Sequence, residues 1–385
     1  MNADRSGIDL ADNEPEGYWE RALKEAAHVI VTSVAGLRKR PSVLVICGPH
    51  NKILAQYIML ESPRVGAHAF LWEFDEGFFL ESLKNASEKP LAAVLSKARS
   101  LVEKSDVIIW LSQFEDVERF PVNVREVVYS FWDAVYEDVK LKPRLLVNLP
   151  SPKTVRAMRI NYLEFLAAFI NGVKVDYARI KGIGVNVALE LAEKNRIRVS
   201  HSNGTDLEFS IEGRHVAVES GTLEDCYSTG KDCGVEVPGG EVYVAPIETS
   251  ANGIFVVDEH KEYGLKRLEL LFADGRIAEF KAERGGDSFK RLLEKAKGGK
   301  DRIGEFGVGT NYGMKPVGWS VYDEKALGTA HIALGNNVHL GGVNEASIHV
   351  DFVLDKPTVE VDNKVILRKG RIVGQRRRAS SRVCR

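Results

Sequence analysis

The sequence has few cysteines and lacks the long apolar runs of membrane and secreted proteins. Its four cysteines, Cys47, Cys226, Cys233 and Cys384, are widely scattered and form no CxxC pair. This spacing favours free thiols in a reducing compartment over a disulfide framework or a zinc-finger site. No apolar run of about 18 residues is present, and the acidic N-terminus has no basic segment before an apolar stretch. We therefore expect a cytoplasmic protein without a membrane partner.

The sequence also lacks an excess of charge of either sign. Lys and Arg total 53 and Asp and Glu total 54, so the net charge is −1. This balance gives no electrostatic reason to expect a nucleic acid or an anionic membrane as the main partner. The last residues, 376–385, are basic, and we interpret them as a solvated tail rather than an RNA- or lipid-binding segment.

The chain is long enough, at 385 residues, for two domains. In residues 1–195, apolar runs typical of buried strands lie at 42–48, 67–74, 106–111 and 144–149. Helical patterns lie at 18–38, 88–103, 122–138, 151–172 and 176–195. Strands that alternate with helices predict an α/β domain with a mostly parallel sheet. The last two helical segments are expected to bridge this domain and the next.

The pattern changes after Asn195. Residues 196–375 hold many short strand patterns separated by Gly, Asn and Asp turns at hairpin-like spacing. One helical pattern, 287–297, interrupts them. The second domain is therefore predicted to be mainly antiparallel β, of the α+β class, and it holds the candidate metal ligands.

The clearest local motif is His349-Val350-Asp351, which lies in the alternating strand pattern ASIHVDFVLD. Residues i and i+2 of a strand point to the same face, so the imidazole and the carboxylate project side by side. Two ligands of one metal ion would be placed in this way. The motif alone is equally compatible with a surface histidine beside a surface acid.

A second histidine, His331, lies in a run of small and apolar residues, GTAHIALG. A histidine in such a run is commonly a core residue. Here, however, the Gly341-Gly342 turn would return the chain towards His349, and small residues allow the backbone to approach a bound ion. His339 lies between the two histidines and is a weaker candidate, expected in a loop or in contact with the ligands.

Two glutamates each follow a glycine and enter an apolar strand, Glu241 in PGGEVYVAP and Glu305 in IGEFGVGTN. Burial of a lone glutamate is strongly unfavourable, and a bound cation would remove that penalty. Each glutamate could instead face water at a strand edge. Both are candidate metal ligands on this argument.

Together the candidate ligands are two histidines and three carboxylates: Glu241, Glu305, His331, His349 and Asp351. Mixed nitrogen and oxygen ligands suit Zn, Co, Mn or Fe rather than Ca. Three carboxylates would repel one another without a cation, whereas two divalent ions would leave the site near neutral. Two ions about 3.5–4 Å apart can activate a water and polarise a carbonyl. A single Fe(II) held by two histidines and one carboxylate would instead indicate an oxygenase.

Five segments in order carry a resemblance to a known family: Gly204–Leu207, PGGEV with Glu241, GEFGVGTN with Glu305, DEKALGTAHIALG with His331, and SIHVDFV with His349 and Asp351. In these segments the sequence resembles the aminopeptidase T (thermophilic-type leucyl aminopeptidase) family of metallopeptidases, over most of the chain and best after residue 195. The resemblance implies two domains, a pair of divalent ions held by residues matching those five, a peptide substrate with a free α-amino group, and a homodimer.

A peptidase of this kind also needs a group that moves protons. Glu305 and Glu324 are the candidates for that role, and the sequence does not separate a base from a ligand. Asp206 in GTDL is expected in a turn or beside the ligands rather than on the metal. Asp323 is expected only to support the ligands.

Val338 departs from the family pattern, which usually has Tyr seven residues after the histidine equivalent to His331. The loop between His331 and His349 is also shorter than in typical members. The missing Tyr could weaken peptidase chemistry or change the substrate. Two further hypotheses about the function therefore stay open. The protein could be an Fe(II) ring-cleaving dioxygenase like the related 2,5-dihydroxypyridine dioxygenases. It could also be a non-catalytic relative that kept the fold.

Overall fold

The computed structural model describes residues 17–37, 41–84, 88–114, 122–224 and 233–373. The chain divides into two compact units. Unit 1 consists of Met1–Tyr177 and Glu219–Gly239, and unit 2 of Ala178–Val218 and Gly240–Arg385. The acidic N-terminus, the predicted basic tail at 376–385, Cys226 and Cys384 lie outside the described residues.

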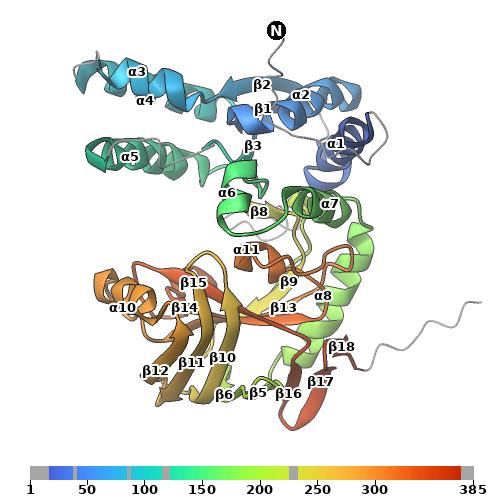
Figure 1. Ribbon diagram of the computed structural model, residues 1–385. Helices are drawn as coiled ribbons and strands as arrows, with labels where there is room; N and C mark the ends of the chain where they lie inside the picture. Colours follow the sequence, from blue (N-terminus) through green and yellow to red (C-terminus); the bar gives the residue numbers. More distant parts are fainter. Residues whose placement is uncertain (1–16, 38–40, 85–87, 115–121, 225–232, 374–385) are drawn as a thin grey trace, which may run out of the picture. The chain divides into compact units, whose positions relative to one another are not determined.

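A five-stranded parallel sheet forms the centre of unit 1 (Figure 1). Its strands, in the spatial order β2-β1-β3-β4-β8, are β1 (Ser42–Cys47), β2 (His68–Glu73), β3 (Val107–Leu111), β4 (Arg144–Val147) and β8 (Gly234–Val237). The first four coincide with the apolar runs of the sequence. The sequence did not predict β8, because GVEV is short and lies among the strand patterns assigned to the second domain. Since β8 pairs with β4, a single boundary after residue 195 does not describe how the chain divides.

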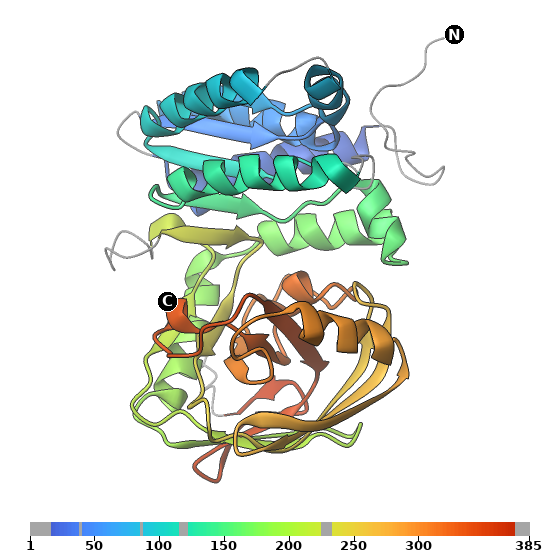
Figure 2. The ribbon, with the colours of Figure 1, turned by 90° about the vertical axis from the view of Figure 1, so that its left-hand side faces the viewer.

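Helices cover both faces of this sheet (Figures 1 and 2). The helices of unit 1 are α1 (Tyr18–Val29), the π-helix η1 (Ile30–Val34), the 3-10 helices η2 (Pro49–Asn51) and η3 (Ser62–Val65), α2 (Lys52–Glu61), α3 (Glu76–Lys84), α4 (Glu88–Glu103), α5 (Val122–Val139), α6 (Pro152–Ala157) and α7 (Tyr162–Val173). Leu44 and Ile108 pack against α4 and α5, whereas the alternate residues Val43 and Ile109 are fully buried on the other face. Burial on both faces explains why these strands are continuous apolar runs.

Two antiparallel sheets form most of unit 2. The larger, in the order β12-β11-β10-β6-β5-β16-β17-β18, contains β5 (Arg196–Ser200), β6 (Asp206–Ser210), β10 (Asn252–His260), β11 (Leu265–Ala273), β12 (Arg276–Arg284), β16 (Thr358–Val361), β17 (Lys364–Arg368) and β18 (Arg371–Ile372). The smaller, in the order β15-β14-β13-β9-β7, contains β7 (Val216–Glu219), β9 (Glu241–Val244), β13 (Ile303–Gly309), β14 (Thr329–Gly335) and β15 (His349–Asp355). The helices are α8 (Tyr177–Leu191), α10 (Gly286–Lys295), α11 (Ser320–Asp323) and the 3-10 helix η5 (Val338–Leu340).

The two sheets of unit 2 share one hydrophobic core. The ring centroids of Phe209 on β6 and Phe306 on β13 are 5.3 Å apart, which joins the larger sheet to the smaller one. Phe289 of α10 packs near Phe352 of β15. Leu191 of α8 belongs to the same core, so α8 packs within unit 2. The sequence had led us to expect that this helix only links the two domains.

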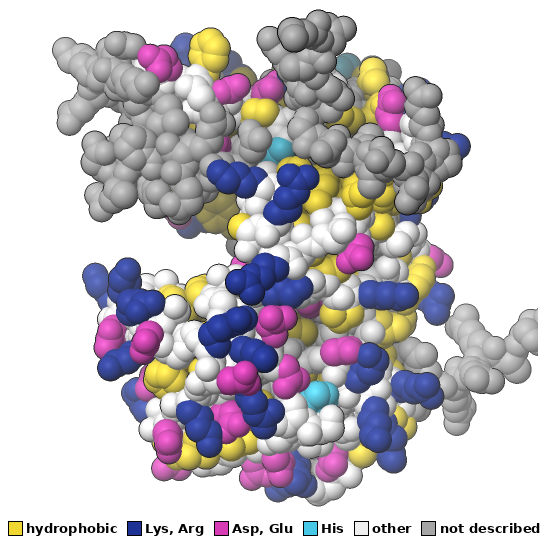
Figure 3. Space-filling model, in the orientation of Figure 1, with side chains coloured by type: hydrophobic (Ala, Val, Ile, Leu, Met, Phe, Trp, Pro, Cys, Tyr) yellow, Lys and Arg dark blue, Asp and Glu magenta, His cyan; other side chains and the backbone are white. Residues whose placement is uncertain are grey.

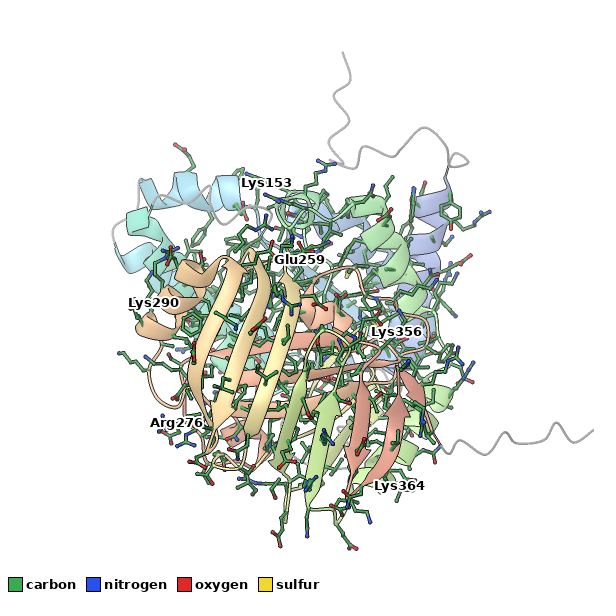
Figure 4. The ribbon with its side chains drawn as sticks, turned by 60° about the horizontal axis from the view of Figure 1, so that its bottom comes forward. Lys153, Glu259, Arg276, Lys290, Lys356 and Lys364 are labelled. Atoms are coloured by element: carbon green, nitrogen blue, oxygen red, sulfur yellow. The ribbon has the colours of Figure 1, made fainter. Side chains whose placement is uncertain are left out.

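The outer face of the eight-stranded sheet is polar. Figure 4 shows this face, with Arg276 and Lys364 at its margins, where β12 and β17 begin. On the face of unit 2 shown in Figure 3, Lys and Arg side chains lie among Asp and Glu side chains. No large area of one sign is visible on this face, in agreement with the balanced composition.

The predicted fold class is confirmed in outline: a parallel sheet with helices in unit 1 and antiparallel sheets in unit 2. The helix predicted at 287–297 is α10, and the strand predicted around the HxD motif is β15. Among the described residues, no helix combines the length and the hydropathy that a bilayer span requires.

Candidate metal centre

The predicted metal ligands lie on one face of the five-stranded sheet in unit 2. Along β13, β14 and β15, core residues such as Phe306, Ile332 and Phe352 alternate with residues that face the opposite side. That opposite side carries the candidate ligands: Glu241 at the start of β9, Glu305 on β13, His331 on β14, and His349 and Asp351 on β15. The alternation along each strand therefore aims all of them away from the hydrophobic core.

Each of these side chains lies beside a glycine or an alanine of a neighbouring strand. The cross-strand pairs are Glu241 with Gly309, Glu305 with Ala333, His331 with Gly307, Asp351 with Ala333, and His349 with Gly335. Large side chains at the paired positions would fill the space above the sheet. Small ones leave room for five polar side chains to approach one another.

Gly307 is the most restricted of these small residues. A Cβ atom built at position 307 would lie 2.1 Å from Cε1 and 2.5 Å from Nε2 of His331. The imidazole therefore occupies the volume that any other side chain at position 307 would take. The glycine is needed here for space, since its φ is not in the left-handed region.

We predict that Gly307→Ala displaces the His331 imidazole. Metal affinity should fall by at least about tenfold, and overpacking should lower the free energy of unfolding by about 1–3 kcal/mol. Calorimetric metal titration and chemical denaturation measure the two effects. Gly286→Ala is a matched control, because its Cβ would meet its nearest atom at an ordinary 3.6 Å. Unchanged metal affinity in Gly307→Ala would show that the position of His331 is not needed.

The five side chains form one connected cluster. Glu305 lies between the histidines: its Oε1 is 3.3 Å from His331 Nε2, and its Oε2 is 3.2 Å from His349 Nε2. His349 Nε2 is also 3.5 Å from Oδ1 of Asp351, and His331 Nε2 is 3.7 Å from Oε2 of Glu241. Glu241 and Glu305 are 5% and 7% exposed, so neither simply faces water at a strand edge.

The proximity of acids and imidazoles shifts the pKa values of the metal-free cluster. Burial raises the pKa of Glu305, but its hydrogen bonds with His331 and His349 outweigh burial and lower it. Burial lowers the pKa of His349, but its contacts with Asp351 and Glu305 outweigh burial and raise it to about 11. The pKa of His331 is raised as well, because the acids around it outweigh its burial. Without metal, the imidazole of His349 is therefore protonated at neutral pH, and that of His331 holds its proton to a higher pH than an ordinary histidine.

Backbone contacts fix the second nitrogen of His349. Its Nδ1 lies 2.9 Å from the carbonyl oxygen of Asn336, in the loop that follows β14. A hydrogen bond from Nδ1 to this carbonyl leaves Nε2 directed at Glu305 and Asp351. Asn344 holds the same loop, because its side chain donates to the carbonyl of Gly335 at 2.6 Å. The glycine-rich loop thus returns the chain from His331 to His349, as the sequence predicts.

A buried lysine next to the cluster was missed in the sequence. Lys325 Nζ lies 2.5 Å from Oε1 of Glu241 and 2.8 Å from Oε1 of Glu324, and Lys325 is only 3% exposed. The segment DEK resembles an ordinary charged surface turn, so nothing local suggested burial. The only indication in the sequence was its position, four residues before the start of the apolar strand β14 that carries His331.

The other residues that the sequence singled out lie outside the five-residue cluster. Asp206 begins β6 in the larger sheet and forms a bidentate ion pair with Arg198, so it is not part of the cluster. Asp323 accepts hydrogen bonds from the backbone N–H groups of residues 317 and 318 and therefore fixes a loop. His339 in η5 lies beside His349, with ring centroids 5.5 Å apart. Val338, where the family usually has Tyr, is half exposed.

The donor set fits a divalent metal ion. Three groups of side chains each place possible ligand atoms within 4.8 Å of one another: Glu241, Glu305 and His331; Glu324, His331 and Asp351; and Glu305, His339 and His349. Shared members make these groups parts of one centre. Oε2 of Glu241 is buried without a hydrogen-bond partner among the described residues, which a cation would supply. Imidazole and carboxylate together suit Zn, Co, Mn or Fe.

A known protein family matches the part of the chain that holds this centre. Residues 184–372 match the family described as thermophilic metalloprotease (M29). The chain is 27% identical to aminopeptidase AmpS of Bacillus subtilis over 186 residues, which cover 42% of this chain and 43% of that protein. It is 23% identical to aminopeptidase T of Thermus aquaticus over 276 residues, or 64% of this chain and 60% of that protein. These matches thus span less than two thirds of either relative.

Solved structures match over nearly the whole chain. Wild-type AmpT from Thermus thermophilus superposes with a TM-score of 0.72 at 18% identity, over 92% of this chain and 100% of that one. A 2,5-dihydroxypyridine dioxygenase from Pseudomonas putida superposes with a TM-score of 0.61 at 15% identity, over 93% and 98%. At these identities the structures show a shared fold. The sequence matches add a similarity to the M29 metalloproteases over residues 184–372, and to named aminopeptidases over part of the chain.

Proposed function

We propose that the protein is a metal-dependent aminopeptidase whose divalent-metal centre is built from Glu241, Glu305, His331, His349 and Asp351. The observation that carries this proposal is the convergence of the five side chains on one face of one sheet. They lie within the residues that match the metalloprotease family. The proposed substrate is a peptide with a free α-amino group.

The protein side chains would hold the metal and keep its ligands in place. A divalent ion held by these residues would lower the pKa of a bound water and polarise a peptide carbonyl. His331 and His349 would bind it as neutral imidazoles through Nε2, and the Asn336 carbonyl keeps His349 in that orientation. Glu305 contacts both imidazoles, so we assign it as a ligand that completes the same coordination sphere.

We assign the proton-transfer role to Glu324 rather than to Glu305. Glu305 is enclosed by the two histidines, whereas Glu324 touches Lys325 and belongs to a group with His331 and Asp351. A carboxylate beside the ligands can accept a proton from water and pass it to a leaving amine. Lys325 would keep this carboxylate ionised and in position.

The alternative of a mononuclear Fe(II) oxygenase uses a subset of the same residues. His331, His349 and Asp351 are the two histidines and one carboxylate that such a site requires. The additional buried carboxylates Glu241 and Glu305 favour the hydrolase, because an oxygenase of this type needs only one acid. Oxygen consumption by the Fe(II)-loaded chain, without peptide hydrolysis, would support the alternative.

The peptidase proposal is tested with matched peptides. The chain is stripped of metal, loaded with Zn, Mn or Co, and given a peptide with a free N-terminus and the same peptide N-acetylated. We expect release of the first residue from the free peptide alone. Failure to hydrolyse the free peptide with any of the three metals would refute the proposal. The homodimer and the cytoplasmic location expected from the sequence remain predictions, and light scattering of the purified chain tests the first.

Metal binding is predicted to release protons. Because the pKa values of His331 and His349 are raised in the metal-free cluster, both imidazoles must lose a proton before they bind a metal. The apparent affinity should therefore rise with pH across the neutral range and fall as acid protonates the imidazoles more completely. Calorimetric titration in two buffers of different ionisation enthalpy should detect up to about two protons per chain. A pH-independent affinity would contradict this expectation.

A further inference from the structure

We propose that the ammonium group of Lys325 serves as the second cation of the centre, so that the chain binds one divalent ion instead of the expected pair. This inference deepens the proposed function and depends on it. It concerns Glu241, the proposed ligand that is left for a second ion once the other four hold the first. It also concerns Glu324, the carboxylate next to Lys325.

Both of these carboxylates already contact a cation. Lys325 Nζ is 2.5 Å from Glu241 and 2.8 Å from Glu324, and none of the three side chains is more than 7% exposed. At these distances the contacts are charge-assisted hydrogen bonds. A divalent ion bound to the same two oxygens would have to displace the ammonium group or lie beside it, and like charges repel strongly in a buried site.

The chain holds the backbone of Lys325 in place. The carbonyl of Lys325 accepts a hydrogen bond from the backbone N–H of Asn311 at 2.9 Å, and its N–H donates to the carbonyl of Tyr322 at 3.3 Å. Gly309 on β13 permits this packing, because a Cβ there would lie 2.1 Å from the carbonyl oxygen of Ala326. The backbone of Lys325 is therefore fixed by hydrogen bonds and close packing, and this position directs its side chain at the two glutamates.

The remaining side chains suffice for one ion. His331, His349, Glu305 and Asp351 provide two imidazoles and two carboxylates, and Glu305 lies 3.2–3.3 Å from both imidazole nitrogens. When ionised, the four carboxylates of the centre, Glu241, Glu305, Glu324 and Asp351, carry four negative charges. Lys325 and one divalent ion neutralise three of them, so one ion already brings the centre close to neutrality.

The test is a metal count on the full chain. The protein is stripped with a chelator, dialysed against excess Mn(II) or Zn(II), passed over a desalting column and measured by mass spectrometry of the metal and by calorimetry. We expect one ion per wild-type chain and two per chain in Lys325→Met, whose unbranched side chain is one atom shorter and carries no charge. Lys325→Arg retains the charge and should stay at one.

Lys261→Met is the matched control and should also stay at one, because Lys261 Nζ contacts the carbonyl of Val317 outside the cluster of acids. Circular dichroism and the unfolding temperature with and without metal establish that each variant is folded. Two ions in the wild type, or one ion in a folded Lys325→Met, would overturn the inference. If Lys325→Met does not fold, the wild-type count and Lys325→Arg still decide. A wild type with no ion would instead refute the proposed function itself.

Discussion

Glu305→Gln is expected to abolish both metal binding and peptide hydrolysis. Glu305 contacts both histidines of the cluster, so its replacement removes one proposed ligand and the anion that orients two others. Loss of a residue that only supports a ligand lowers metal affinity by about 10–100-fold. Loss of a central ligand should therefore lower kcat/KM by at least about 1,000-fold at limiting metal. Hydrolysis of a peptide with a free N-terminus and a metal count on the same preparation measure the two effects.

Glu279→Gln is the control for this variant. Glu279 is an exposed glutamate of β12, on the larger sheet of the same unit, and the same change there should affect neither property. Glu305→Gln also removes a negative charge next to the imidazoles, so the pKa of His349 should fall towards its ordinary value. A Glu305→Gln protein that keeps its full metal content and its full activity would show that Glu305 is not a ligand.

Glu324→Gln is expected to lower the rate of hydrolysis while leaving metal content unchanged. The amide keeps the shape of the side chain but cannot accept a proton from water at neutral pH. General acid–base groups contribute about 10²–10⁴-fold to the rate, so kcat should fall by a factor in that range with little change in KM. Steady-state kinetics of the metal-loaded variant provide this comparison.

The two glutamate variants separate a ligand from a proton carrier. Glu305→Gln should lose metal and activity together, whereas Glu324→Gln should lose only activity. Added metal in excess could partly restore Glu305→Gln but should not restore Glu324→Gln. If Glu324→Gln loses its metal instead, Glu324 is a ligand and the proton-transfer role belongs to another group.

The sequence was sufficient to find the candidate ligands because strand alternation is a local property. His349 and Asp351 share a face simply because they are two residues apart on β15. Glu241 and Glu305 were predicted as candidate ligands because a glutamate buried without a partner is strongly unfavourable. That these segments are neighbours in one sheet depends on the pairing of β9, β13, β14 and β15, which only the structure shows.

The features that the sequence missed depend on contacts between distant segments. Lys325 becomes a buried residue because Gly309, on another strand, lets its turn pack closely. β8 is a four-residue strand whose assignment depends on pairing with β4, about 90 residues earlier. Gly307 resembles any glycine in a strand until His331 is placed over it. In each case the local sequence pattern is compatible with several conformations, and contacts with distant segments determine which one forms.

The most direct test of the metal centre is anomalous diffraction from crystals of the full chain grown with Mn(II) or Zn(II). We expect an anomalous peak bonded to the Nε2 atoms of His331 and His349 and to a carboxylate oxygen of Glu305, with Zn–ligand distances of about 2.0–2.2 Å. Absence of a peak at this position in metal-saturated crystals, or histidines and acids turned away from one another, would contradict the account.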